Sequence, residues 1–531
     1  MNLSPLVSNK ENKMTANIPR VILAGTNSGC GKTTVTCALL KALVNRKLNT
    51  VSFKCGPDYI DPMFHSSITG SVCGNLDSFF FDENTLKCLL AEDSEGHDIS
   101  IIEGVMGYYD GLELSSFRAS TYEIARLTDT PSILVVGARG ASLSVLATIE
   151  GFLNFSRNED SNIRAVILNQ CTQMTYKILA DEITRRFDGR IKPLGFMPVM
   201  PDCSLESRHL GLITAAEVTD LNEKLQRLAE QAEQTIDIDG IISIAQDAPN
   251  LDIEPVKLPH APHKVSSSTD TLNDGQPARA VNLGVQPLFE NACADCFLAV
   301  AAPSQHASVL TSACKAREQD RPTITVRIAI ARDNAFCFYY EDSLRLLEKL
   351  GAELVPFSPL NDSHLPSDIH GIYLGGGYPE LYAEKLSSNK TMLDEIGTAL
   401  SNKLPCIAEC GGFMYLTEQI ADYPMVGFLK GSCYDTGRLS RFGYINIVAE
   451  HDGLLCKRGQ SIAAHEFHHW DCDNTGDSFK AIKPSGRLWP AIIMTDSLYA
   501  GYPHFHFYAN PEFAWNFYRA CSEYDADQVQ H

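Results

Sequence analysis

A glycine-rich segment near the start of the sequence carries the residue types that bind nucleotide phosphates. Residues 21–34 read VILAGTNSGCGKTT, an apolar run followed by a glycine-containing turn and a helix-compatible stretch. In such a P-loop, backbone N–H groups surround the phosphates, a lysine reaches the terminal phosphates and a hydroxyl ligates Mg²⁺. Lys32 and Thr33 occupy those two positions. The predicted nucleotide-binding residues are Asn27, Ser28, Gly29, Cys30, Gly31, Lys32, Thr33 and Thr34.

Acidic residues after two later apolar runs are candidates for binding magnesium and substrate. The two segments are residues 53–62, FKCGPDYIDP, and residues 101–111, IIEGVMGYYDG. Carboxylates beside a phosphate cradle hold Mg²⁺ or orient a substrate, because an unpaired acid there would repel ATP. The alternative interpretation is that both segments are turns with solvated acids. We predict Thr33, Asp58 and Glu103 as metal ligands, and Lys54, Asp58, Tyr59 and Asp61 as contacts to substrate or phosphate.

A cysteine in the second half stands where a nucleophile would be presented to a substrate. Residues 404–416 read LPCIAECGGFMYL, an apolar strand that leads through Cys410 and a glycine turn into a helix. Such an elbow lifts the thiol from the sheet, and the helix N-terminus is expected to lower the thiol pKa. Cys406, on the strand itself, is interpreted as core packing. The predicted oxyanion donors are the backbone N–H groups of Gly376, Gly377 and Gly411.

Two histidine-containing segments are candidates for a chemical role. A thiol nucleophile needs a base that is distant in sequence and close in space, and GYPHFHFYANP supplies His504 and His506 near the C-terminus. Two inward-facing histidines of a β-strand are the alternative. Residues 465–469, HEFHH, formally match the zinc protease signature, but that chemistry requires a helix. The alternation in SIAAHEFHHWD predicts a strand instead. In a strand, His465 and His469 would lie roughly 13 Å apart, too far to share a zinc ion.

Length and composition describe a soluble protein of several domains. A chain of 531 residues is too long for a single hydrophobic core, so we expect several domains. A content of 44% hydrophobic and 21% charged residues is ordinary for a globular protein. The net charge of −21 argues against a nucleic-acid partner. The sequence has no apolar run long enough to span a bilayer and no recognisable signal peptide, so we expect no membrane association. Its 17 scattered cysteines favour reduced thiols and a cytoplasmic location. The lone CxxC pair, Cys293 and Cys296, is weak evidence for a metal site.

The apolar pattern divides the chain into two α/β halves. Short apolar runs alternate with helix-compatible stretches up to about residue 247, which indicates βαβ units and a parallel, doubly wound sheet. Residues 248–322 are rich in Pro, Ser, Thr and Asp and are predicted to be a linker or insertion. The pattern resumes at residue 326. We predict a flexible tail at 1–19, a P-loop domain at 20–247 and a second α/β domain at 324–531.

These motifs together closely resemble the cobyrinic acid a,c-diamide synthase family, whose ATP-binding domain is related to dethiobiotin synthetase. The shared segments are GTNSGCGKTT, FKCGPDYIDP, NLDSF (75–79), EGVMGYYDG and SRHLGL (207–212), in family order. One departure is Gly137 in VVGARG, where the family usually has Asp. The second half resembles the class I glutamine amidotransferase domain. The resemblance covers most of residues 20–247 and 324–515.

The resemblance implies an ATP- and glutamine-dependent ligase. It favours His504 as the base, because the family has an aromatic residue, one residue, then His. Many class I amidotransferases carry Glu two positions further on, but His506 stands there, so the resemblance implies a Cys410–His504 dyad with no identified third member. Glutamine would release ammonia at Cys410. ATP with Mg²⁺ would phosphorylate a carboxylate in the first half, and ammonia would then displace phosphate.

The implied substrate is cobyrinate or hydrogenobyrinate, amidated at the a and c acetates on the way to cobalamin, and SRHLGL is a candidate contact to the macrocycle. The small-molecule partners would be the corrinoid, glutamine and ATP. Oligomeric state is left open, a homo-oligomer included. Two alternatives remain: a diamide synthase acting on another acidic tetrapyrrole, such as nickel-sirohydrochlorin, and a MinD-like ATPase with an inactive amidotransferase domain. Cys410 together with His504 argues against the second, because an inactive domain needs neither.

Overall fold

The first half of the chain is built around a parallel β-sheet. The computed structural model describes residues 14–113, 115–156, 160–203, 207–208, 211–212, 220–259 and 325–524. Within these ranges the sheet has seven strands in the order β4-β3-β5-β2-β6-β7-β8, every neighbouring pair parallel. The strands are β2 Arg20–Gly25, β3 Thr50–Cys55, β4 Gly74–Leu76, β5 Ile99–Glu103, β6 Ser132–Gly137, β7 Ile163–Asn169 and β8 Lys192–Met197.

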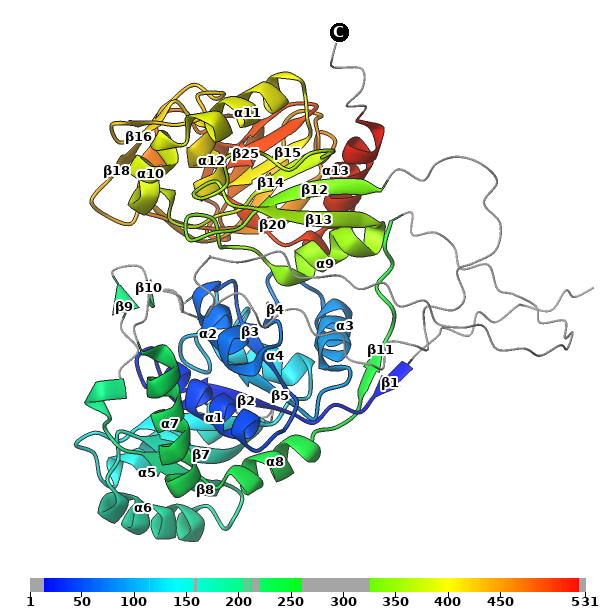
Figure 1. Cartoon of the computed structure of the whole chain (residues 1–531). Helices are drawn as coiled ribbons and strands as arrows, with labels where there is room; N and C mark the ends of the chain where they lie inside the picture. Colours follow the sequence, from blue (N-terminus) through cyan, green and yellow to red (C-terminus); the bar gives the residue numbers. More distant parts are fainter. Residues whose placement is uncertain are drawn as a thin grey trace, which may run out of the picture.

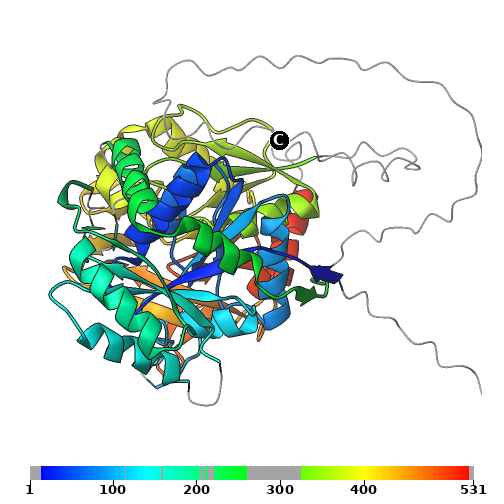
Figure 2. The ribbon, with the colours of Figure 1, turned by 90° about the horizontal axis from the view of Figure 1, so that it is seen from below.

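Helices cover both faces of this sheet, as the view from below shows (Figure 2). Strand residues alternate between two apolar clusters: Val21 and Leu23 of β2 pack on one face, and Ile22 and Ala24 pack on the other. The first face carries α1 Lys32–Asn45, α2 Ile60–Thr69, α7 Leu221–Thr235 and α8 Ile238–Gln246. The other carries α3 Glu83–Ser94, α4 Thr121–Leu127, α5 Ser144–Asn154 and α6 Gln173–Arg186. The predicted doubly wound α/β fold is therefore confirmed.

The predicted boundaries of the tail and the linker need a correction. Strand β1, Met14–Ala16, pairs with β11, Leu251–Ile253, and Ile18 is buried. The side chain of Asn84 also exchanges hydrogen bonds with the backbone of Glu254. Residues 14–19 and 248–254 thus belong to the first domain, because β11 contacts α3 and because Ile18 and Leu251 pack in the apolar cluster on that face. The rest of the predicted tail, residues 260–322 of the predicted linker and the Cys293/Cys296 pair lie outside the described residues.

The second half has its own mixed sheet. In residues 325–524 this sheet contains six strands in the order β13-β12-β14-β15-β25-β24, parallel except for the β24 edge. The strands are β12 Val326–Ala331, β13 Ala352–Phe357, β14 Gly371–Leu374, β15 Cys406–Glu409, β24 Ile493–Met494 and β25 Leu498–Gly501. One face packs on α10 Ala383–Ser388, α11 Lys390–Ser401 and α12 Gly411–Leu416. The other packs on α9 Glu341–Leu350 and α13 Pro511–Glu523.

A smaller antiparallel sheet and a small mixed sheet, in which β16 and β18 are parallel, complete the second half. As described, a five-stranded sheet runs β23-β22-β19-β20-β26, and a four-stranded one runs β17-β16-β18-β21. The first comprises β19 Arg441–Ala449, β20 Ser461–His468, β22 Phe479–Ile482, β23 Leu488–Ala491 and β26 His504–Phe505. The second comprises β16 Gln419–Ile420, β17 Tyr423–Pro424, β18 Ser432–Asp435 and β21 Trp470–Cys472. The HEFHH segment therefore begins in strand β20, as its alternation predicted.

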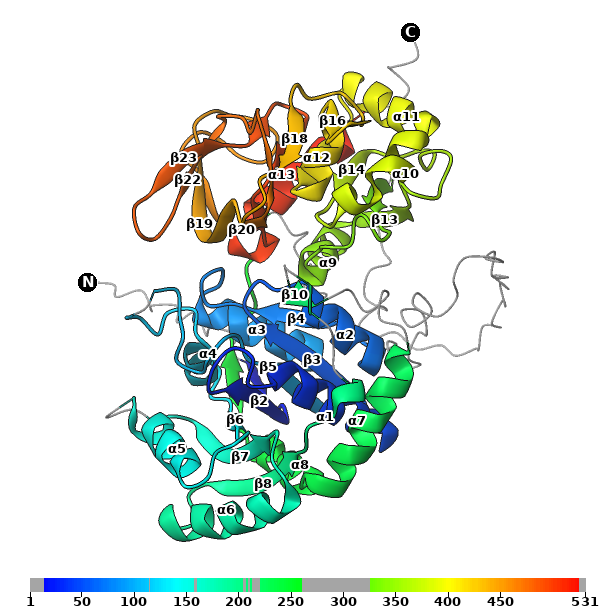
Figure 3. The ribbon, with the colours of Figure 1, turned by 90° about the vertical axis from the view of Figure 1, so that its left-hand side faces the viewer.

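The two halves lie one above the other and share a continuous apolar cluster (Figure 1). Helix α9 of the second half contacts β4 of the first at their boundary (Figure 3). Polar contacts cross the same boundary: the Tyr444 hydroxyl donates to Asp77 Oδ2 at 2.8 Å, and Arg345 Nη2 donates to Asp93 Oδ2 at 2.7 Å. None of the helices in the described ranges is both long and apolar enough to cross a bilayer.

Candidate active site

The turn between β2 and α1 has the conformation that phosphate binding requires. Gly31 adopts a φ of 94° at the N-cap of α1, and a Cβ there would lie 1.9 Å from Nδ2 of Asn169, so the position requires glycine. That amide, at the end of β7, donates to the Cys30 carbonyl at 2.8 Å and fixes the turn. The loop tip at residues 27–29 is exposed. Lys32 is buried and its Nζ donates to the carbonyls of Met106 and Asn27.

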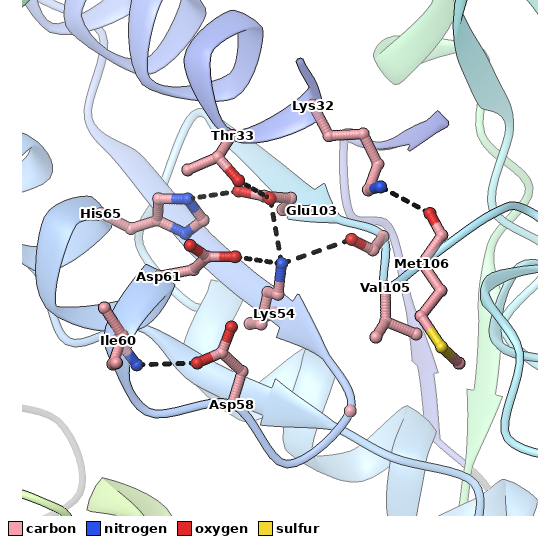
Figure 4. A network of polar contacts seen from close by, with 12 residues as sticks. Lys32, Thr33, Lys54, Asp58, Ile60, Asp61, His65, Glu103, Val105 and Met106 are labelled. Carbon is pink, nitrogen blue, oxygen red and sulfur yellow. Dashed lines mark hydrogen bonds and ion pairs between the residues drawn. The ribbon is translucent and has the colours of Figure 1, made fainter. Parts of the chain in front are cut away.

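A buried network of charged side chains lies beside this turn (Figure 4). Glu103, at the end of β5, accepts from Thr33 Oγ1 at 2.7 Å and from Lys54 Nζ at 2.9 Å through Oε1. Its Oε2 lies 2.8 Å from His65 Nε2. Lys54 also contacts the Asp61 carboxylate. The structure thus brings together four predicted site residues, Thr33, Lys54, Asp61 and Glu103, because the carboxyl ends of β3 and β5 are adjacent.

The network shifts the pKa values of its two carboxyl groups, Glu103 and Asp61, in opposite directions. Burial alone would raise the pKa of Glu103, but the Lys54 charge and the hydrogen bond from His65 lower it well below its usual range. Burial and the neighbouring Glu103 charge instead raise the pKa of Asp61 to about 8. Burial also opposes the charge of Lys54, yet Asp61 and Glu103 raise its pKa well above normal. Of the two carboxylates, Glu103 is therefore the one whose surroundings more strongly favour the charged form.

Two other predicted contacts lie apart from this network. Asp58 Oδ1 accepts from the backbone N–H of Ile60 at 2.9 Å, at the start of α2. The Tyr59 ring is 8% exposed and stacks on Phe338 of the second half, with centroids 5.1 Å apart. Asn75, in the NLDSF motif, donates to the carbonyls of Gly56 and Asp58 and so holds this loop in place. The loop after β3 therefore faces the second half.

The donor set is compatible with a magnesium ion that is bound together with nucleotide. Mg²⁺ usually takes one or two carboxylates or hydroxyls from the protein and completes its shell with phosphates and water. Thr33 Oγ1 and Glu103 Oε1 already meet at 2.7 Å beside the P-loop. Within the ranges described, no three His, Cys, Asp or Glu side chains gather as metal ligands. The residues therefore fit a phosphate-bound Mg²⁺ rather than an all-protein metal centre.

In the second half, Cys410 lies at a strained elbow between β15 and α12. Its φ of 49° is rare for a residue with a side chain and is typical of strained functional turns. The Cys410 N–H donates to the Gly501 carbonyl at 2.7 Å, and the Cys410 carbonyl accepts from Met414 N at 2.9 Å. The elbow predicted from LPCIAECGGFMYL is present, and Cys410 is 8% exposed.

The glycine loop after β14 lies against this elbow and against His504. A Cβ on Gly376 would lie 2.4 Å from Cε1 and 3.2 Å from Nε2 of His504. A Cβ on Gly411 would lie 3.1 Å from the backbone nitrogen of Gly377. The three predicted oxyanion glycines therefore lie at or beside the Cys410 turn, and the predicted base lies next to one of them, Gly376.

One expectation about the thiol needs correction. The structure raises the pKa of Cys410 instead of lowering it, because burial and the negative charge of Glu380 outweigh the hydrogen bond from the Gly411 backbone. Helix α12 has only six residues, Gly411–Leu416, so its N-terminal dipole is small. The thiol is therefore protonated at neutral pH in this structure and needs a base to become a nucleophile.

The remaining histidines have other partners. His506 Nδ1 accepts from Tyr508 N at 3.2 Å, and its Nε2 lies 3.7 Å from Asp342 Oδ2. His465 pairs with His504 across β20 and β26, and their rings stack with centroids 5.2 Å apart. Burial and the His504 charge lower the pKa of His465 well below its usual value. His465 is thus a neutral neighbour of the predicted base.

Three contacts near the predicted sites involve residues that were not singled out in the sequence. His65 lies one helical turn after Asp61 in α2, a spacing that could have drawn attention to it. Asp77 and Tyr444 join the two halves, and Glu409 Oε2 lies 3.2 Å from His504 Nδ1. Of the SRHLGL segment, the structure describes β9 Ser207–Arg208 and β10 Gly211–Leu212, while residues 209–210 lie outside the described residues.

Fold and site define a P-loop nucleotide-binding domain joined to a glutamine amidotransferase-like domain. Residues 21–213 match the family model described as the CobQ/CobB/MinD/ParA nucleotide binding domain, and residues 327–512 match the CobB/CobQ-like glutamine amidotransferase domain. The chain is 36% identical to a Clostridium acetobutylicum protein named cobyrinate a,c-diamide synthase, over 93% of this chain and 98% of that protein. Proteins of the same name from Limosilactobacillus reuteri and Caldanaerobacter subterraneus are each 34% identical, over 93% and 95% of this chain and 96% and 98% of theirs. The chain belongs to the cobyrinate a,c-diamide synthase family, as its motifs predicted.

Proposed function

We propose that this protein uses ATP and glutamine to convert the a and c acetate carboxylates of cobyrinate, or of hydrogenobyrinate, into amides during cobalamin biosynthesis. The observation that carries the proposal is the presence of two complementary sites in one chain. A P-loop with an adjacent Thr33–Glu103 pair supports phosphate chemistry. A buried cysteine at an elbow, with His504 beside the facing glycine loop, supports release of ammonia from glutamine.

At the second site, the proposed nucleophile is Cys410. His504 Nε2 takes the thiol proton as the sulfur attacks the side-chain amide carbon of glutamine. The backbone N–H groups of Gly377 and Gly411 are proposed to stabilise the resulting oxyanion. Nε2 then returns the proton to the departing nitrogen, ammonia leaves, and water cleaves the thioester to give glutamate and free Cys410.

At the first site, an acetate oxygen of the macrocycle attacks the γ-phosphorus of ATP, and ADP leaves. Ammonia next attacks the acyl carbon, a proton is lost and inorganic phosphate leaves, which yields the amide. Lys32 and Lys54 are the proposed cations that stabilise charge on the phosphates. Thr33 and Glu103 would hold Mg²⁺, which supplies positive charge against the phosphate oxygens when bound. Asp58, Tyr59 and Asp61 stay proposed contacts to substrate or phosphate.

The loop after β3 supports internal transfer of ammonia. An acyl phosphate hydrolyses readily, so ammonia is best delivered without release to solvent. The strand that carries Lys54 leads within five residues to Tyr59, whose ring lies 5.3 Å from the ring of His504. The two proposed sites therefore meet across one short segment. We also propose a cytoplasmic location, supported by the need for ATP and by the free thiols of the described cysteines.

Mass spectrometry of the products tests the proposal. The protein is incubated with ATP, Mg²⁺ and glutamine plus cobyrinate, hydrogenobyrinate or nickel-sirohydrochlorin, each in a separate reaction. The proposal predicts two successive replacements of O by NH in cobyrinate or hydrogenobyrinate, with one ADP released for each. Amidation of nickel-sirohydrochlorin alone would contradict the proposed substrate, and ATP hydrolysis without any amide product would contradict the proposed reaction.

A further inference from the structure

The imidazole of His504 has an acidic neighbour on the strand that carries the proposed nucleophile. Glu409 is the last residue of β15 and directly precedes Cys410. Its Oε2 lies 3.2 Å from His504 Nδ1, and the residue is 1% exposed. The end of β15 therefore carries a carboxylate that contacts His504 and leads directly to the proposed nucleophile.

The alternation of β15 explains why Glu409 and Cys410 lie on different faces of the sheet. Ala408 packs in the cluster that contains α12, whereas Ile407 packs in the cluster on the opposite face of the sheet. Glu409 follows the alternation and lies on the Ile407 face, where Phe505 of β26 also packs. The strained turn then carries Cys410 away from the strand.

Other groups hold the Glu409 carboxylate in this position. The Tyr373 hydroxyl, from β14, donates to Oε1 at 3.3 Å, and the Phe505 backbone N–H forms a further hydrogen bond. A carboxylate buried in an apolar sheet face is costly unless it is hydrogen-bonded. With His504 Nδ1, three donors therefore surround the carboxylate, one from β14 and two from β26.

Many class I amidotransferases carry Glu two residues after the catalytic histidine, but His506 occupies that position here and has a different partner. His506 stands two residues after His504 and faces Asp342, at 3.7 Å. Among the described residues, Glu409 is the only carboxylate within hydrogen-bond distance of His504. Strand β26 and the residue that follows it therefore present two separate histidine–carboxylate pairs, His504 with Glu409 and His506 with Asp342.

We propose that Glu409 is a positioning residue that completes a Cys410–His504–Glu409 triad for glutamine hydrolysis, an inference that rests on the proposed function. By accepting the Nδ1–H of His504, the carboxylate fixes the tautomer that leaves an Nε2 lone pair, on the side of the ring that faces Gly376. When Nε2 takes the Cys410 proton, Glu409 stabilises the imidazolium without itself accepting that proton.

The test compares Glu409→Gln with Glu409→Asp and Cys410→Ala in the full-length protein, measuring glutamine hydrolysis and ammonium-dependent amidation separately. Glu409→Gln is expected to lower kcat for glutamine by about 10²–10⁴-fold, because the amide cannot stabilise the imidazolium. KM for glutamine should change by less than about threefold, since the residue does not contact the substrate. Ammonium-dependent amidation should stay unchanged, which also shows that the variant folds. Glu409→Asp should recover part of the lost rate.

The pH profile separates positioning from a purely structural role. Loss of the carboxylate should move the acid limb of glutamine kcat/KM to lower pH, whereas Asp342→Asn, the matched change beside His506, should leave the profile in place. An unshifted profile with near-normal hydrolysis in Glu409→Gln would overturn the inference, and so would an equal loss of both activities. If Cys410→Ala still hydrolyses glutamine, the proposed function fails and the inference falls with it. If Cys410→Ala does not hydrolyse glutamine but Glu409→Gln does so at a near-normal rate, the proposed function stands and only the role proposed for Glu409 is contradicted.

Discussion

The ring of Tyr59 lies 5.3 Å from the imidazole of His504, although the two residues come from different halves of the chain. Tyr59 also contacts Tyr340, with ring centroids 4.6 Å apart. It follows the strand that carries Lys54 and precedes the helix that carries Asp61 and His65. One loop therefore connects the phosphate network to the proposed glutaminase site, and we expect the buried Tyr59 ring to shield that site from solvent at the boundary.

The Tyr59→Ala variant is expected to lose to solvent part of the ammonia that it releases from glutamine. Removing the ring opens space beside His504, so water enters and ammonia escapes before it reaches the acyl phosphate. The ratio of glutamine hydrolysed to amide formed should rise severalfold, while added ammonium should restore amide formation. The ratio is measured by quantifying glutamate and amide in one reaction. Tyr59→Phe keeps the ring and should keep the ratio, as should Tyr423→Ala at an exposed tyrosine. An unchanged ratio in Tyr59→Ala would show that the ring is not a barrier.

Lys54→Met is expected to destabilise the first half by about 3–5 kcal/mol, because it leaves Glu103 buried without its principal cation. The measurement is urea denaturation followed by a probe in the first domain. Adding Asp61→Asn to this variant removes a second buried acid and should recover part of the loss. If Lys54→Met is as stable as the wild type, the buried charge network does not support the fold.

Burial of Asp77, which accepts from Tyr444 at the boundary between the halves, makes the stability of the protein depend on pH. Burial raises the pKa of Asp77 to about 6, so the folded protein holds this proton at pH values where the unfolded chain has lost it. Stability therefore falls as pH rises from about 4 to about 6, by about 3 kcal/mol from this group. Asp77→Asn cannot ionise and should lack this contribution. The difference between the two denaturation curves against pH isolates the effect, and parallel curves would contradict it.

Local features of the fold were predictable from sequence because they depend on neighbouring residues. The continuous apolar run of β2 and the glycine turn before Lys32 identify a buried strand and a phosphate loop without reference to distant residues. The elbow at Cys410 is similarly encoded by residues 404–416. The helix dipole argument failed at Cys410 for a physical reason, since burial of the thiol outweighs the small dipole of a six-residue helix.

The contacts between elements were not predictable in the same way. Glu409 and His504 are 95 residues apart in sequence, and Asp77 and Tyr444 are 367 apart. Such pairs depend on how the sheets pack, and a single sequence carries no direct record of that packing. Tyr59 illustrates the limit: its motif indicated a site contact, while its packing against Phe338 depends on the second domain.

Lys32→Ala is expected to lower the rate of amidation by about 10²-fold or more. The loss should be the same with glutamine and with ammonium as the nitrogen source, because both routes need the acyl phosphate. Basal glutamine hydrolysis should persist. The two activities are measured by amide product and by glutamate release. Lys41→Ala, further along the same helix, is the matched control and should amidate normally. Normal amidation by Lys32→Ala would mean that the P-loop does not bind the reacting ATP.

The central claim is that ammonia made at Cys410 is consumed at the P-loop site. The most direct measurement is amide formation by Cys410→Ala with glutamine and, separately, with ammonium as the nitrogen source. The two-site account predicts that this variant forms no amide from glutamine but matches the wild type with ammonium. Equal loss with both nitrogen sources, or retained activity with glutamine, would contradict it.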